Sequence, residues 1–189
     1  ALIIPVLGFG YLAYVRSQSA NIPPIHDVTT NVDDPPVYSE AMIALRTAEE
    51  ANPVAEFSAP LTSLPAYQGP RFAPLAGKSL GQVGQGAYPE LVTLVTTTAP
   101  ADAFAAAEAE ARAQGWTIVS ADAGAGVIEA TAETFWFGFK DDVVIRVRPA
   151  EAGSAIDMRS TSRVGLSDLG ANAARIEAYM TALSSRLAD

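Results

Sequence analysis

The chain has 189 residues, of which 49% are hydrophobic and 17% are charged. This length and composition suit a globular domain with a real core plus additional segments, and they argue against global disorder. Twelve basic and 21 acidic residues give a formal net charge of −9. Because nucleic-acid phosphates are bound by clustered Lys and Arg, this charge disfavours nucleic acid as a partner.

Cysteine is absent from the chain and histidine occurs once, although both are common in catalytic and metal sites. There is no cysteine, which excludes disulfides, thiolate nucleophiles, zinc–thiolate sites and iron–sulfur clusters. His26 is the single histidine, so a metal site built from several histidines is excluded as well. We therefore expect no metal centre, and nothing in the sequence indicates a cofactor.

The chain begins with an uncharged apolar stretch, residues 1–15, which is followed by Arg16. A helix of this length covers about 22 Å, less than the roughly 30 Å hydrocarbon core of a bilayer. Because Tyr11 and Tyr14 precede Arg16 as in an interfacial belt, we interpret residues 1–16 as the end of a transmembrane helix. A signal-peptide core and a buried helix of the soluble domain are the alternatives.

Prolines interrupt residues 17–87 throughout. One helix is expected at residues 39–51, where Ser39 suits the N-cap position. An irregular segment of this length is unusual unless it packs over a domain or spans a distance. In a free linker, apolar side chains such as Phe57 and Phe72 would be exposed to water with nothing to pack against. We therefore expect this arm to wrap the folded domain.

The folded domain is expected over residues 88–189. β-branched residues between turn signals predict five strands, at residues 91–98, 116–121, 127–136, 141–148 and 154–162. Helices are predicted at residues 101–114 and 169–187 from their caps and their apolar periodicity. The order β-α-β-β-β-β-α predicts an α+β two-layer sandwich, with an antiparallel sheet of about five strands, helices packed on one face and an extended N-terminal arm.

Alternation in the last two strands predicts an apolar face toward the helices and an arginine-rich face away from them. Pairing of these strands places Arg146 opposite Asp157. When the alternation is run back along residues 127–136, Glu129 falls on the apolar face. A β-bulge near residues 132–134 would correct this misplacement, and we expect one there.

Five arginines lie close together in an otherwise acidic chain: Arg146, Arg148, Arg159, Arg163 and Arg175. Because guanidinium binds carboxylates and phosphates at two points, this face is a candidate site for a lipid phosphate, a carboxylate or an acidic partner protein. Asp168 and Asn172, around the start of the last helix, are added to this candidate site. The alternative interpretation is a ladder of salt bridges on a solvated face.

His26 and Asp27, together with a serine elsewhere, suggest a hydrolase-like group, but no nucleophile-elbow motif accompanies them. A hydrogen-bonded packing role is the simpler interpretation, and no residue is assigned as catalytic. Trp136, in an aromatic run, is a candidate for lining a ligand pocket, with core packing as the alternative.

Several motifs can be compared with known families. They are residues 23–30 (PPIHDVTT), 134–148 (TFWFGFKDDVVIRVR), 157–160 (DMRS) and 167–172 (SDLGAN). Together they resemble the domain-of-unknown-function 1499 family over about residues 22–187, so the folded unit is expected to begin near residue 22. The resemblance implies an extracytoplasmic or lumenal protein, often behind a membrane anchor, and it implies no activity.

The function stays open, and one hypothesis is favoured. It is a membrane-tethered periplasmic domain that acts as a non-catalytic accessory subunit of a membrane complex. The N-terminal helix would contact the membrane, and the arginine face with the loop at 162–172 would bind a partner protein, an anionic ligand or a lipid headgroup. Two alternatives stay open: a hydrolase-like enzyme that uses His26, and a carrier of a small apolar ligand in a cavity between sheet and helices.

Overall fold

The computed structural model describes residues 22–134 and 138–188. At its centre is an antiparallel sheet with the strand order β1-β6-β5-β4-β3, and β2 pairs with the same edge of β6 as β1 does. The strands are β1 (Asp27–Thr29), β2 (Leu94–Thr96), β3 (Thr117–Asp122), β4 (Val127–Glu133), β5 (Lys140–Ala150) and β6 (Gly153–Ser162). The α-helices are α2 (Glu40–Ala48), α3 (Leu80–Ala87), α4 (Pro100–Ala113) and α5 (Ala171–Ala188).

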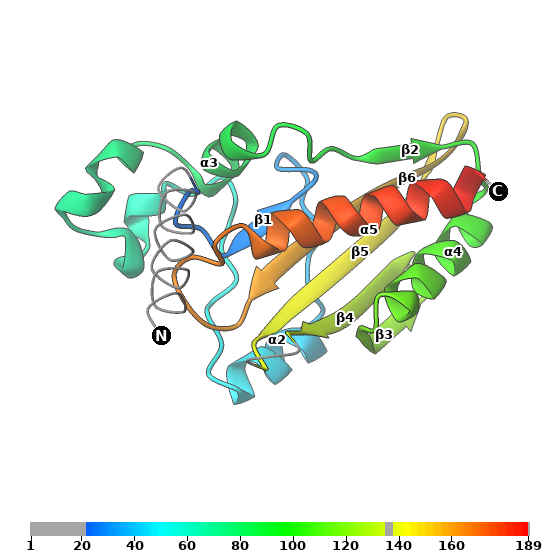
Figure 1. The fold of residues 1–189 in the computed structure, drawn as a ribbon, viewed down its shortest axis with the longest axis horizontal. Helices are drawn as coiled ribbons and strands as arrows, with labels where there is room; N and C mark the ends of the chain where they lie inside the picture. Colours follow the sequence, from blue (N-terminus) through cyan, green and yellow to red (C-terminus); the bar gives the residue numbers. More distant parts are fainter. Residues whose placement is uncertain (1–21, 135–137, 189) are drawn as a thin grey trace, which may run out of the picture.

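Helices α4 and α5 lie across one face of the sheet (Figure 1). The main core forms between them and the sheet, where Val143 and Ile145 of β5 pack in the same cluster as Ile176 and Tyr179 of α5. The Tyr179 hydroxyl donates a hydrogen bond of 2.8 Å to the carbonyl of Ala107, which ties α5 to α4. The α+β sandwich predicted from the element order is confirmed.

The arm, which we define as residues 22–87, covers other parts of the sheet. It supplies β1 at the sheet edge and then α2 on the face opposite α4 and α5, where Tyr38 and Met42 pack on Val144. Val144 faces away from α4 and α5 because successive residues of a strand point to opposite sides. Beyond α2 the arm forms 3-10 helices at Leu61–Ser63, Pro65–Tyr67 and Pro70–Leu75 before α3.

The β-bulge expected near residues 132–134 is not there. The pairing of β4 with β5 is regular from Val127 to Glu133, and the register shift lies instead in β3, between Ile118 and Ser120. Because β4 ends at Glu133, its alternation does not have to continue into the aromatic run. Glu129 thereby lies on the α2 face, where its carboxylate accepts hydrogen bonds from Ser39.

The prediction of a transmembrane helix is corrected. Within residues 22–134 and 138–188, no helix combines the length and the apolar character that crossing a bilayer requires. The segment on which the prediction was based, residues 1–16, lies outside the described residues.

Candidate functional site

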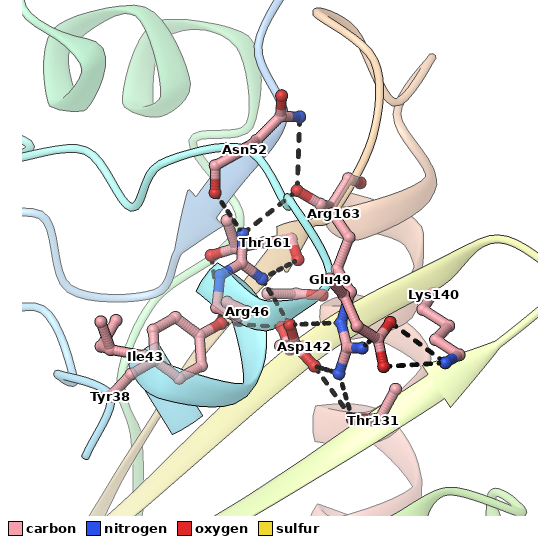
Figure 2. A network of polar contacts seen from close by, with 12 residues as sticks. Tyr38, Ile43, Arg46, Glu49, Asn52, Thr131, Lys140, Asp142, Thr161 and Arg163 are labelled. Atoms are coloured by element: carbon pink, nitrogen blue, oxygen red, sulfur yellow. Dashed lines mark hydrogen bonds and ion pairs between the residues drawn. The ribbon is translucent and has the colours of Figure 1, made fainter. Parts of the chain in front are cut away.

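A buried polar network joins the arm to the sheet (Figure 2). Its centre is Asp142 of β5, which is 0% exposed and contacts two arginines. Arg46 of α2 binds one carboxylate oxygen, and Arg163 binds both, at 2.9 Å and 2.6 Å. Arg163 also donates to Glu49, just after α2, and Lys140 of β5 binds Glu49 at 3.1 Å. Ion pairs thereby connect α2 and Glu49 of the arm to β5 and to Arg163, which follows β6.

A second ion pair holds β1 and the arm against β6. Arg159 is 3% exposed and donates to the two carboxylate oxygens of Asp27 at 2.9 Å and 2.7 Å. It also donates to the arm carbonyls of Pro36 and Ala55. Its guanidinium lies 4.7 Å from the centroid of the Phe57 ring. This arginine is therefore surrounded by arm atoms.

The remaining arginines of this face, Arg146 and Arg148, share the carboxylate of Asp157. The predicted pairing of Arg146 with Asp157 is confirmed, with an Nη2–Oδ2 distance of 3.0 Å, and Arg148 donates to the same oxygen at 2.5 Å. Asp34 of the arm binds Arg146 from the solvent side at 3.0 Å. The Thr93 hydroxyl donates to Asp157 at 2.5 Å.

Asp157 gives a pH-dependent prediction. Burial raises the pKa of its carboxyl, but the hydrogen bonds from Thr93, Arg146 and Arg148 outweigh burial and leave the pKa below its ordinary value. Such a group adds stability above its unfolded pKa of about 3.9, and this stability is lost as the pH falls through the folded pKa.

We therefore expect the free energy of unfolding of the natural protein to fall more steeply below about pH 4 than that of Asp157→Asn, which has no carboxyl to protonate there. Urea unfolding over that acidic range measures the two slopes. Parallel curves for the two proteins would contradict the assignment.

The loop before α5 and the first turns of α5 form hydrogen bonds and an ion pair with other residues of the protein. The Asp168 carboxylate accepts two backbone N–H groups at the start of the helix, at 2.8 Å and 2.9 Å, and burial raises the pKa of this carboxyl. Asn172 is fully buried and donates to the carbonyl of His26 at 3.1 Å. Arg175 binds Asp141 at 2.5 Å. Asp168 thus serves as the cap of α5.

The predicted site residues therefore have partners within the protein. Each of the five arginines contacts a carboxylate of the same chain: Arg146, Arg148, Arg159, Arg163 and Arg175. Three of the carboxylates that they contact, Asp27, Asp34 and Glu49, belong to the arm. The salt-bridge interpretation matches this geometry, although Arg159 and Arg163 are buried rather than solvated. Binding of an outside partner or anion through these residues stays a prediction.

A pocket with a volume of about 320 Å³ opens where the arm meets the start of β1. Its walls come from three stretches of sequence: the residue before β1, residues 52–67 later in the arm, and the loop after β6. The main wall residues are His26, Asn52, Val54, Leu64, Tyr67 and Leu166. Mostly apolar walls with few polar groups, and a volume of this order, are typical of small-molecule sites.

His26 is a buried polar group in the wall of this pocket, and its ring lacks a hydrogen-bond partner among the described residues. Its side chain is 7% exposed, and neither ring nitrogen has a hydrogen-bond partner within the described part of the chain. A neutral imidazole carries one donor and one acceptor. Leaving such buried groups unpaired costs about 1–3 kcal/mol each, and native proteins contain few of them.

His26 does not form a catalytic pair with Asp27. The Asp27 carboxylate belongs to the Arg159 ion pair and accepts a hydrogen bond of 2.7 Å from the Thr161 hydroxyl. In residues 22–134 and 138–188, no acid or hydroxyl group is hydrogen-bonded to the His26 ring. Activation of a nucleophile by histidine requires such contacts, so the geometry gives the hydrolase hypothesis no support.

The pocket connects to the polar network through Asn52. The Asn52 carbonyl accepts a hydrogen bond of 2.8 Å from Arg46 (Figure 2). The Asn52 backbone N–H donates to the carbonyl of Arg163 at 2.7 Å. Its side chain donates to the carbonyl of Gly165 at 2.6 Å, which links two pocket walls. Apart from His26, these wall residues were not predicted, because no periodicity in the arm shows which side chains meet. The candidate Trp136 lies outside the described residues.

Comparison with known proteins gives one match to a family. The family described as "Protein of unknown function (DUF1499)" matches residues 27–183, which is most of the chain. The matched range includes β1, α2, the polar network and most of the pocket walls. No curated protein matches the chain significantly.

Proposed function

The chain belongs to the DUF1499 family of proteins of unknown function, and we propose that it is a non-catalytic binding domain for a small, largely apolar molecule with one hydroxyl or similar group. The observation that carries this proposal is the unpaired imidazole of His26 in the wall of the pocket. The proposal follows the carrier hypothesis, with the ligand between the arm and the loop after β6 rather than between sheet and helices. An extracytoplasmic location, which the family resemblance implies, stays a prediction.

The chemistry of the pocket supports a hydroxyl-bearing ligand. A hydroxyl both donates and accepts, so it can pair with either nitrogen of a neutral imidazole. The apolar walls add the free energy of removing the rest of the ligand from water. Because Arg46 and Arg163 hold the backbone of Asn52, this wall is fixed before a ligand arrives, which lowers the entropy cost of binding.

The single histidine permits a direct test by NMR. Para-cresol and para-xylene have nearly the same shape and differ by a hydroxyl in place of a methyl group. We expect para-cresol to shift the ring nitrogen resonances of His26 in a saturable way, with para-xylene binding more weakly. Unchanged His26 resonances at the highest soluble concentration of para-cresol would refute the proposal.

His26→Leu is expected to abolish the preference for para-cresol and to raise the free energy of unfolding by about 1 kcal/mol, because it removes two buried polar atoms without partners. Urea unfolding measures the change in stability. The matched control is Tyr179→Phe, which removes a buried hydroxyl that does have a partner, the Ala107 carbonyl, and should lose about 1 kcal/mol. Equal losses in both variants would show that the imidazole is not an unpaired group.

A further inference from the structure

Two basic residues, Arg71 and Lys78, differ from the other cations of the described residues. Every other Lys and Arg there forms an ion pair with a carboxylate, whereas these two form none within residues 22–134 and 138–188. Both lie in residues 57–89, which contain no Asp or Glu. A locally basic segment thus occurs in a chain with a net charge of −9.

This segment forms a lobe at one end of the molecule, on the far side of β1 from α4 (Figure 1). An apolar hollow of about 590 Å³ opens there, lined by Ile22, Pro24, Arg71, Phe72, Leu75 and Leu166 among others. Leu166 also borders the His26 pocket, so the two hollows are neighbours with different walls.

Arg71 lies in the wall of this hollow. Its guanidinium carbon lies 4.4 Å from the centroid of the Phe72 ring, a wall residue, so the cation sits against the apolar surface. The side chain is exposed, and no acidic residue of its own segment competes for it. A cation beside an apolar hollow is complementary to a molecule with an anionic head and a hydrocarbon chain.

We propose that this hollow binds a free fatty acid, with the carboxylate against Arg71 and the chain along Phe72, Leu75 and Leu166. The volume lies within the range of about 300–1,000 Å³ that is usual for ligand pockets. This site is additional to the His26 pocket and does not depend on it. Since an exposed ion pair contributes little, most of the affinity comes from the buried chain, and the charge selects the acid over the alcohol.

Calorimetric titration of the folded protein with dodecanoate, below its micelle concentration, tests the proposal. We expect one site, and we expect Arg71→Gln to weaken dodecanoate binding about three- to fivefold. Arg112→Gln is the matched control, because it makes the same charge change at an exposed, paired arginine of α4 and should leave the affinity unchanged. Dodecanol, which has the same chain without the charge, should bind equally to both variants and to the natural protein.

Equal dodecanoate affinity in Arg71→Gln and the natural protein would overturn the proposal. So would loss of dodecanoate binding in His26→Leu with no effect of Arg71→Gln, because the chain would then occupy the His26 pocket. The para-cresol titration of His26 is read independently, so failure at one site is distinguishable from failure at the other.

Discussion

Asp142→Asn should lower the free energy of unfolding by about 3–5 kcal/mol, because it leaves Arg46 and Arg163 buried without their common anion. Asparagine keeps the size of the side chain, so the loss reports charge rather than packing. Folded domains are stable by only about 5–15 kcal/mol, so this variant would lose a large share of its stability. Urea unfolding at neutral pH measures the change.

Glu49→Gln is the matched control within the same network. Glu49 also binds Arg163, but its side chain is 38% exposed, and Arg163 keeps Asp142 when Glu49 is neutral. Exposed ion pairs contribute little to stability, so the loss should be small. Similar losses for Asp142→Asn and Glu49→Gln would mean that burial of the network does not determine its contribution.

Arg159→Met is expected to lower the free energy of unfolding by about 3–5 kcal/mol, as Asp142→Asn does. Here the variant removes the cation of a buried ion pair rather than the anion. It leaves the carboxylate of Asp27, which is 1% exposed, without its cation, and it removes the donors that satisfy the carbonyls of Pro36 and Ala55. Because β1 has three residues, its attachment to β6 depends heavily on this pair. Urea unfolding again gives the magnitude.

A double-mutant cycle separates the ion pair from the other contacts of Arg159. Once Asp27→Asn has removed the buried charge, adding Arg159→Met should cost less than it costs in the natural protein. The double variant should therefore be more stable than the sum of the two single losses predicts. Additive losses would show that Asp27 and Arg159 do not stabilise each other.

The elements after residue 88 were predictable because each has a local signal. Pro100 begins α4, and Gly115, at φ 78°, follows its end. The apolar spacing of α5 and the alternation of β5 likewise depend on neighbouring residues alone. By contrast, β1 was missed, because three residues carry no periodicity and its stability comes from pairing with β6, more than a hundred residues away.

The candidate site was less predictable for the same physical reason. The alternation of Arg146 and Arg148 indicated a polar face correctly, but no local signal shows that Asp34 reaches that face from 112 residues away. The contact between Arg163 and Glu49, 114 residues apart, cannot be predicted from local patterns either. His26 was identified as unusual because it is the single histidine, yet its pocket depends on how the proline-rich arm folds back.

A crystal of the protein grown with 4-bromophenol tests most directly whether His26 faces a bound ligand. The anomalous signal of bromine locates the ligand without reference to any assumed site. We expect bromine in the pocket between Leu64, Tyr67 and Leu166, with the phenol oxygen within hydrogen-bond distance of a His26 ring nitrogen. Bromine bound only at other sites, with the pocket empty, would contradict the proposal.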